Sequence, residues 1–237
     1  MARKTTAQVT HGQTGTSGRS SSVVPDTMAT TAIPALEWGS YPVPSGSEVT
    51  RHRFGTTTMH ISQGRPVPGE PELPVMKVAI TYGPDDGSVE PVWSFLVPAR
   101  MDHSYIIRPV YPSDPVCIRI DTPLSLARDA TLEGWFTSII DLELVTGGLA
   151  VTTYPLEPPF RTLFGSPDKG LVCRFGNAAF EFQESAAKAS IRGCQARVLH
   201  PVRLRNSSDD KITVQDLVLY GEQLSAFWTG TNLQSEP

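Results

Sequence analysis

The sequence predicts an all-β protein, an antiparallel β-sandwich with very little helix. Apolar and polar residues alternate in many short segments, the pattern of strands that bury one face. Residues that favour turns separate these segments at short intervals, as in sandwiches and barrels. The 237 residues include 21 prolines, which interrupt nearly every stretch long enough for a three-turn helix. One sandwich or two sandwich-like or barrel-like lobes would fit this pattern.

The alternating segments give the predicted strands in order. They cover 75–82, 92–97, 105–110, 116–121, 132–145, 149–154, 171–175 and 178–183. A longer alternation spans 190–205, with an apolar row of Cys194, Ala196, Val198, His200, Val202 and Leu204 and an opposite row of Gln195, Arg197, Arg203 and Arg205. Five turn-forming residues at 206–210 separate it from an apolar segment at 212–220. This order predicts a hairpin with a longer loop.

Two windows carry a weak helical signal. Residues 122–128 begin with a Thr cap and a Pro at the first helical position, but Leu124 and Leu126 also continue the alternation. We expect the preceding strand to run through this window. Residues 184–189 are rich in Ala but too few for a stable isolated helix, so we expect a loop or a single turn.

The two ends of the chain differ from its body in composition. Residues 1–31 are rich in Thr, Ser and Gly and predict a disordered tail, followed by an all-β domain over 36–230 and a flexible C-terminus at 231–237. A weak composition break at 121–130 would suit a lobe boundary, although a continuous sandwich fits equally well. Two interpretations of this tail remain: translation begins at Met28, or residues 1–31 form a genuine flexible arm. The tail lacks the apolar core of a secretory signal, so we expect a cytoplasmic protein.

Several functional classes lack the residues they need. The formal net charge of −4 provides no overall positive field, so general nucleic-acid binding is not expected. Only the tail is mildly basic, with three basic residues and one acidic residue. No apolar run approaches the roughly 18–20 residues of a membrane helix, so we expect no transmembrane segment. The sequence contains no G-x-S-x-G, Walker loop or G-x-G-x-x-G, and we expect no cofactor. An enzyme without a local motif remains compatible with these absences.

Cysteine and histidine give few leads to a reactive or metal site. Cys117, Cys173 and Cys194 have no metal-binding spacing, and their odd number favours a reduced chain. We expect Cys173 and Cys194 to be buried, whereas Cys117 shares a face with Arg119, and a nearby cation can lower a thiol pKa. Cys117 is therefore the best candidate for a reactive thiol.

The five histidines form no metal motif, and we expect no metal. His52 and His60 would share a face if they lay on one extended strand, and His200 falls in an apolar row, where a hydrogen-bonded core imidazole is expected. Asp85, Asp86 and Glu90 lack the order of a calcium loop, so a solvated hairpin tip is expected there.

Charged residues within predicted strands are more informative. Asp141 and Glu143 would face the same side of a strand, an arrangement that raises one pKa when it is partly buried. Five arginines lie in or beside predicted strands: Arg100, Arg108, Arg119, Arg161 and Arg174. They either pair with carboxylates across the sheet or form an anion-binding face.

Three local strings resemble the archaeal and bacterial family called domain of unknown function 432. They are Trp-Gly-Ser-Tyr at 38–41, Ile-Arg-Pro-Val-Tyr-Pro at 107–112 and the most specific, Leu-Phe-Gly-Ser-Pro-Asp-Lys-Gly-Leu-Val-Cys-Arg at 163–174. The resemblance spans roughly 36–230. It implies a compact β-rich protein of unassigned activity and supplies no catalytic residues.

The string at 163–174 also suggests a site. Its Gly, Pro and Asp residues predict a tight turn that brings Arg161 and Arg174 close together across a hairpin. With Arg108 and Asp168 they form our candidate anion-binding site. The corresponding function is that of a binding module for a protein partner or a small anionic ligand. The sequence does not indicate an oligomeric state. The alternative is a hydrolase acting on an anionic or carbohydrate substrate.

Overall fold

The computed structural model describes residues 37–65, 75–83, 91, 93–98, 104–191, 195–230 and 232–236. These residues form sixteen strands, a short α-helix and a 3-10 helix, which confirms the all-β class. The strands are β1 (Gly39–Pro42), β2 (Val49–Phe54), β3 (Thr57–Gln63), β4 (Val75–Tyr82), β5 (Trp93–Pro98), β6 (Ser104–Val110), β7 (Val116–Leu126), β8 (Thr131–Ile139), β9 (Asp141–Thr146), β10 (Leu149–Pro155), β11 (Arg161–Phe164), β12 (Leu171–Ala178), β13 (Arg197–Arg205), β14 (Ile212–Leu219), β15 (Ala226–Trp228) and β16 (Leu233–Ser235). The helices are α1 (Glu184–Ser190) and the 3-10 helix η1 (Gly221–Gln223).

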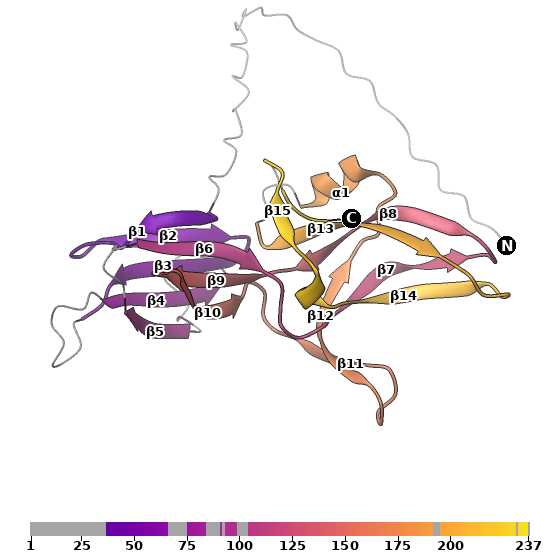
Figure 1. Ribbon diagram of the computed structural model, residues 1–237, viewed down its shortest axis with the longest axis horizontal. Coiled ribbons are helices and arrows are strands. Elements are labelled where there is room, and N and C mark those ends of the chain that lie inside the picture. Colours follow the sequence, from indigo (N-terminus) through magenta and orange to yellow (C-terminus); the bar gives the residue numbers. More distant parts are fainter. Residues whose placement is uncertain are drawn as a thin grey trace, which may run out of the picture. The chain divides into compact units, whose positions relative to one another are not determined.

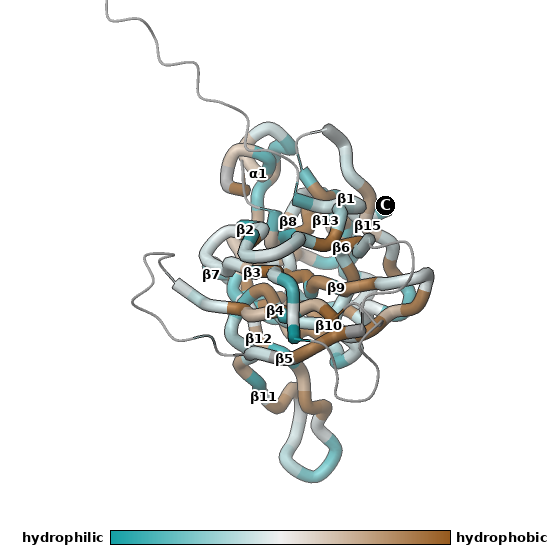
Figure 2. The backbone as a smooth tube through the Cα atoms, turned by 90° about the vertical axis from the view of Figure 1, so that its left-hand side faces the viewer, coloured by the Kyte–Doolittle hydropathy of each residue, from teal (hydrophilic) through white to brown (hydrophobic). Residues whose placement is uncertain are grey.

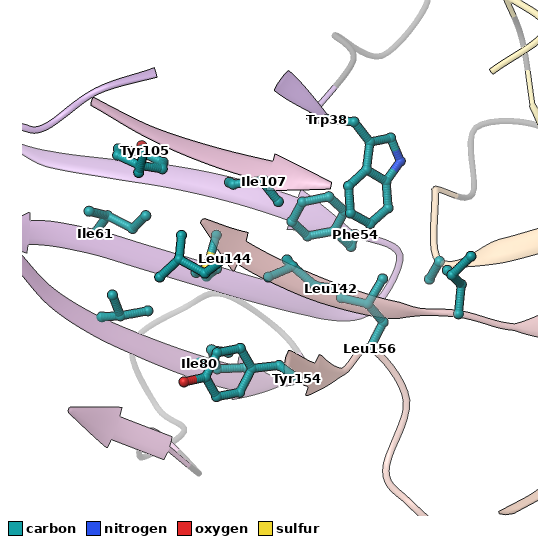
Figure 3. Packing of buried hydrophobic residues seen from close by; sticks show 14 of the residues in the cluster. Trp38, Phe54, Ile61, Ile80, Tyr105, Ile107, Leu142, Leu144, Tyr154 and Leu156 are labelled. Atoms are coloured by element: carbon teal, nitrogen blue, oxygen red, sulfur yellow. The ribbon is translucent and has the colours of Figure 1, made fainter. Parts of the chain in front are cut away.

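One large hydrophobic cluster joins two four-stranded antiparallel sheets. The sheets have the orders β1-β6-β9-β10 and β2-β3-β4-β5, and both send apolar side chains into the shared interior (Figure 3). Trp38 packs on Phe54 with ring centroids 4.5 Å apart, and Leu142 and Leu144 come from the facing sheet. Hydrophobic stretches of β4 and β9 stand out as brown segments in Figure 2.

A second pair of sheets has the orders β11-β12-β7-β14 and β15-β16-β13-β8 (Figure 1). Val116 and Ile118 of β7 share a buried cluster with Phe136 and Ile139 of β8. The pairing is mixed, since β12 runs parallel to β7 and β13 runs parallel to β16. The chain moves between the two pairs of sheets at Ile140, which is fully buried between β8 and β9.

Several predicted strands are confirmed. The alternation at 75–82 coincides with β4, and β7 continues through Leu124 and Leu126 as expected. The alternation at 132–145 corresponds to two strands, β8 and β9, that belong to different sheets.

The hairpin expected from the segments at 190–205 and 212–220 is wrong. β13 pairs with β8 and β16, whereas β14 pairs with β7 in another sheet. Alternation reveals the buried face of a strand but not its neighbour, and a turn-rich loop joins strands of two sheets as readily as strands of one. Asn206 fixes this connection because its side-chain amide donates to Leu126 O, Ala127 O and Asp210 O at 2.8–3.1 Å.

Residues 178–190 also differ from the expectation. In place of a full strand at 178–183, only a single bridge between Trp135 and Glu181 forms outside β12. In place of a loop or one turn, Glu184–Ser190 forms helix α1. Ala187 is buried against Ile191 and Leu199, and this packing stabilises a helix too short to persist alone. The same packing buries Leu199, on the face of β13 opposite the predicted apolar row.

The two ends of the chain have different outcomes. Where a flexible C-terminus was expected, Leu233–Ser235 forms β16 with Leu233 buried in the large cluster. The predicted tail at 1–31 and the question of Met28 lie outside the described residues. Within the described residues, no helix is both long enough and apolar enough to cross a membrane.

Candidate functional site

Arg161 and Arg174 lie directly opposite each other on β11 and β12, as the predicted hairpin required. Gly165 begins the turn with a φ of 99°, a backbone conformation that glycine adopts readily and other residues rarely adopt. Lys169 N donates to Ser166 O at 3.2 Å within the turn, which appears as the teal loop beyond β11 in Figure 2. The string at 163–174 thus places the two arginines side by side through ordinary turn chemistry.

The two guanidinium groups have different environments. Arg161 is 66% exposed at its side chain, and its Nη2 donates to Asp114 Oδ2 at 3.0 Å. Arg174 is only 5% exposed, and its Nη1 donates to buried Asp141. Burial raises the pKa of Asp141, while Arg174 opposes that effect. Among the described atoms, Arg174 Nε and Nη2 have no hydrogen-bond partner.

The other two predicted site residues lie apart from this pair. Arg108 of β6 pairs with Glu143 of β9 and lines a separate pocket of about 520 Å³ with Tyr111 and Gly221. Asp168 is exposed in the turn between β11 and β12. Arg108 and Arg161 line two different pockets, and Arg174 belongs to the lining of neither.

Arg161 instead belongs to a pocket of about 560 Å³ that brings three arginines together. The pocket is lined by Arg119, Glu157, Phe160, Arg161, Thr162, Phe175, Gly176, Asn177 and Arg197. Its arginines come from three different strands, β7, β11 and β13. We call this set of residues the arginine pocket.

Sheet register and carboxylates hold the arginines in place. Arg119 faces Asp216 across β7 and β14, and its Nε and Nη2 donate to the carboxylate at 2.9 and 3.4 Å. The Arg119 guanidinium also lies over the Phe175 ring, 5.4 Å from its centroid. Asp216 raises the pKa of Arg119, which keeps this group cationic.

Arg197 is held by a carboxylate and a backbone carbonyl. Its Nε and Nη2 donate to Glu157 at 2.9 and 3.0 Å, and its Nη1 donates to Asn177 O at 3.1 Å. Such a fork fixes the plane of the guanidinium group. Of the four charged residues in the lining, three are cations and only Glu157 is an anion. Three guanidinium groups therefore gather at the pocket, and each is held by a carboxylate: Arg119 by Asp216, Arg161 by Asp114 and Arg197 by Glu157.

A family model described as "Protein of unknown function (DUF432)" matches residues 38–237. The chain belongs to this family. No curated protein and no solved structure gives a significant match to this DUF432 chain. The family description names no activity.

The two cysteines among the described residues of the DUF432 chain are both buried. Cys117 and Cys173 are buried and reduced, as expected for Cys173. Burial raises the pKa of the Cys117 thiol and outweighs the opposing effect of Arg119. The reactive thiol suggested for Cys117 is thus contradicted, because the loss of solvation dominates over the nearby cation. Cys194 lies outside the described residues.

Among the described histidines, His52 and His200 are buried and hydrogen-bonded. His52 and His60 lie on the paired strands β2 and β3, and the register places them on opposite faces rather than on a shared one. His52 is buried, with Nδ1 2.9 Å from Glu37 Oε2 and Nε2 2.8 Å from Tyr105 Oη. His200 is the expected core imidazole, stacked on Phe136 and 2.6 Å from Ser138 Oγ.

No group of three potential metal ligands occurs within the described ranges of the chain. Asp85, Asp86 and Glu90 lie outside those ranges. Sequence reasoning selected Arg119 and Arg161 as strand arginines but missed Arg197 and Phe160. Arg197 belongs to the polar row of β13, opposite the predicted apolar row. This pattern predicts a surface position for Arg197 but not which strands surround it.

Proposed function

We propose that this DUF432 protein is a binding module for a small anionic ligand, which binds in the arginine pocket. The observation that carries the proposal is the convergence of Arg119, Arg161 and Arg197 on one pocket that contains a single carboxylate. Guanidinium groups present planar sets of N–H donors that match phosphate and carboxylate oxygens. A volume of about 560 Å³ lies within the range of small-molecule sites.

The arginines differ in how freely they can serve a ligand. Among the described residues, Arg161 uses only Nη2 in a hydrogen bond, to the partly exposed Asp114. Exposed ion pairs are weak, so a ligand anion competes for this guanidinium at small cost. Arg119 keeps Nη1 outside its pair with Asp216. Arg197 has a structural pairing with Glu157 and contributes mainly its positive field.

The proposal is tested by calorimetry and thermal melting with phosphate, sulfate and citrate. We expect at least one anion to bind, to raise Tm, and to bind more weakly as NaCl increases, because salt screens the arginines. Arg119→Gln and Arg161→Gln should each weaken binding, whereas the exposed Arg203→Gln should not, since Arg203 pairs with Glu133 outside this pocket. Equal affinity in all four proteins, or no binding in the parent, would overturn the proposal.

The hydrolase alternative gains no comparable support from the described residues. Ser138 and His200 form the one buried Ser–His hydrogen bond among them, at 2.6 Å. Both side chains are buried, and the ring of Phe136 stacks on His200. A nucleophile must reach its substrate, so this buried pair favours a structural role in the contact between β8 and β13.

A further inference from the structure

We infer that the ligand of the arginine pocket carries a flat aromatic ring beside its anionic group, as nucleoside monophosphates do, and that the ring stacks on Phe160. This inference rests on the proposed function and adds the chemical class of the ligand. It depends on one unusual side chain: Phe160 is 69% exposed and lines the same pocket as the three arginines.

The backbone around Phe160 is held in a defined conformation. Phe160 N donates to Pro158 O at 2.9 Å, and Phe160 O accepts from Phe175 N at 2.8 Å. Pro158 and Pro159 each have a restricted φ, which limits the freedom of the segment that leads into β11. Phe160 is therefore presented to solvent by an ordered segment, whereas water disfavours exposure of so large an apolar surface.

The two phenylalanines of the pocket differ in what covers them. The guanidinium of Arg119 lies over the ring of Phe175 and thereby covers one face of that ring. Among the described residues, no ring or cation stacks on Phe160. Phe160 thus offers an open aromatic face next to Arg161, its neighbour in sequence, whose guanidinium is also exposed. An aromatic face beside a cation matches a ligand that joins a flat ring to an anion.

A third group in the pocket suits a heteroaromatic ring. Asn177 is exposed, and its backbone carbonyl already accepts from Arg197, which fixes the position of the residue. Its side-chain amide provides both a donor and an acceptor, the pairing that the polar edge of a nucleobase requires. Stacking on an aromatic side chain strengthens base binding by about ten-fold or more. The ring should consequently contribute affinity that the anion alone does not.

The test compares phosphate compounds with and without an aromatic ring, and it includes adenosine as a ring compound without the phosphate. AMP, phenyl phosphate, ribose 5-phosphate, adenosine and inorganic phosphate are titrated into the full-length protein by calorimetry. We expect AMP and phenyl phosphate to bind about ten-fold more tightly than ribose 5-phosphate and inorganic phosphate, respectively. Adenosine, which lacks the anion, should bind more weakly than AMP.

Variants assign the effect to Phe160. Phe160→Ala should remove the advantage of AMP over ribose 5-phosphate, while Phe160→Trp should retain it because the ring is kept. Phe182→Ala is the matched control, since Phe182 is 64% exposed but does not line the pocket. Arg161→Gln should weaken AMP and ribose 5-phosphate alike.

The outcomes separate the two proposals. If AMP and ribose 5-phosphate bind equally in the parent protein, or if Phe160→Ala leaves their ratio unchanged, the aromatic ligand is wrong and the anion site stands. If adenosine binds as tightly as AMP, the anion does not contribute and both proposals fail. If none of the phosphate compounds binds, the nucleotide-like ligand is wrong, and the anion site fails as well when sulfate and citrate also do not bind.

Discussion

Arg161 and Arg174 are direct register partners on β11 and β12, yet each bonds to a carboxylate in a different environment. Arg161 pairs with Asp114 at the surface, whereas Arg174 pairs with Asp141 where both side chains are almost fully buried. The same residue type at paired positions therefore serves two purposes. Arg161 forms an exposed surface pair, and Arg174 connects β12 to β9 through a buried one.

Arg174→Met should lower the free energy of unfolding by about 3–5 kcal/mol, because it leaves the buried carboxylate of Asp141 without its cation. Arg161→Met should cost less than about 1 kcal/mol, as expected for an exposed pair. Urea denaturation measures both values. The double variant Arg174→Met with Asp141→Leu should recover most of the loss, and an equal cost for the two single variants would contradict this account.

Acid should destabilise the protein through His200. Burial lowers the pKa of His200 from 6.5 to about 4, so the unfolded chain binds more protons between those pH values. Stability is then fully present above pH 6.5 and is lost as pH falls toward 4, by about 3 kcal/mol for this group. Urea unfolding across pH 4–7 should show this slope, and His200→Gln should flatten it. The slope that remains includes His52, whose pKa burial also lowers.

Gly134→Ala should destabilise the protein by about 1–3 kcal/mol through overpacking. A Cβ on Gly134 would lie 2.3 Å from the Phe180 ring and 2.8 Å from Glu181 O, where Trp135 and Glu181 form a bridge. Gly176→Ala is the control within a strand, because its Cβ would meet only Ile139 Cγ2 at an ordinary 3.8 Å. Thermal melting should rank the two variants in that order, and a similar Tm for both would count against close packing at Gly134.

Asn206→Ala should cost about 2–3 kcal/mol, because it removes the amide that binds three backbone carbonyls between β7 and the segment after β13. Asn206→Asp should be nearly as harmful, since a carboxylate accepts hydrogen bonds and cannot donate to carbonyls. Ser208→Ala loses the hydrogen bonds that Ser208 Oγ donates to Asn206 Oδ1 and Asp210 O, and it should have a smaller effect because the Asn206 amide keeps its three carbonyl partners. Chemical denaturation of the three variants measures this ranking.

The sequence was sufficient for the fold class but not for strand partners. Alternation predicted β4 and the full length of β7, because one face of each strand is buried. It missed the β2–β3 hairpin, where Thr, His and Arg carry much of the pattern. It also could not place β13 and β14 in separate sheets, since partner choice depends on packing between distant segments.

The site was predictable to a similar degree. The turn residues at 165–170 were enough to place Arg161 opposite Arg174. No local pattern indicated that Arg174 would be buried against Asp141, or that Arg197 would join Arg119 and Arg161 around one pocket. The first relationship joins β12 to β9 and the second draws residues from β7, β11 and β13, so both exist only after the sheets have formed.

The position of β7 between β12 and β14 has a consequence for biosynthesis. β7 pairs in parallel with β12 and antiparallel with β14, and the latter leaves the ribosome about a hundred residues later. Contacts between segments so distant in sequence form slowly. The hydrogen-bonding edges of β7 must therefore wait for β12 and β14 during translation, although Val116 and Ile118 can pack on Phe136 and Ile139 of β8 sooner. This nascent stage is where a chaperone would have most to protect.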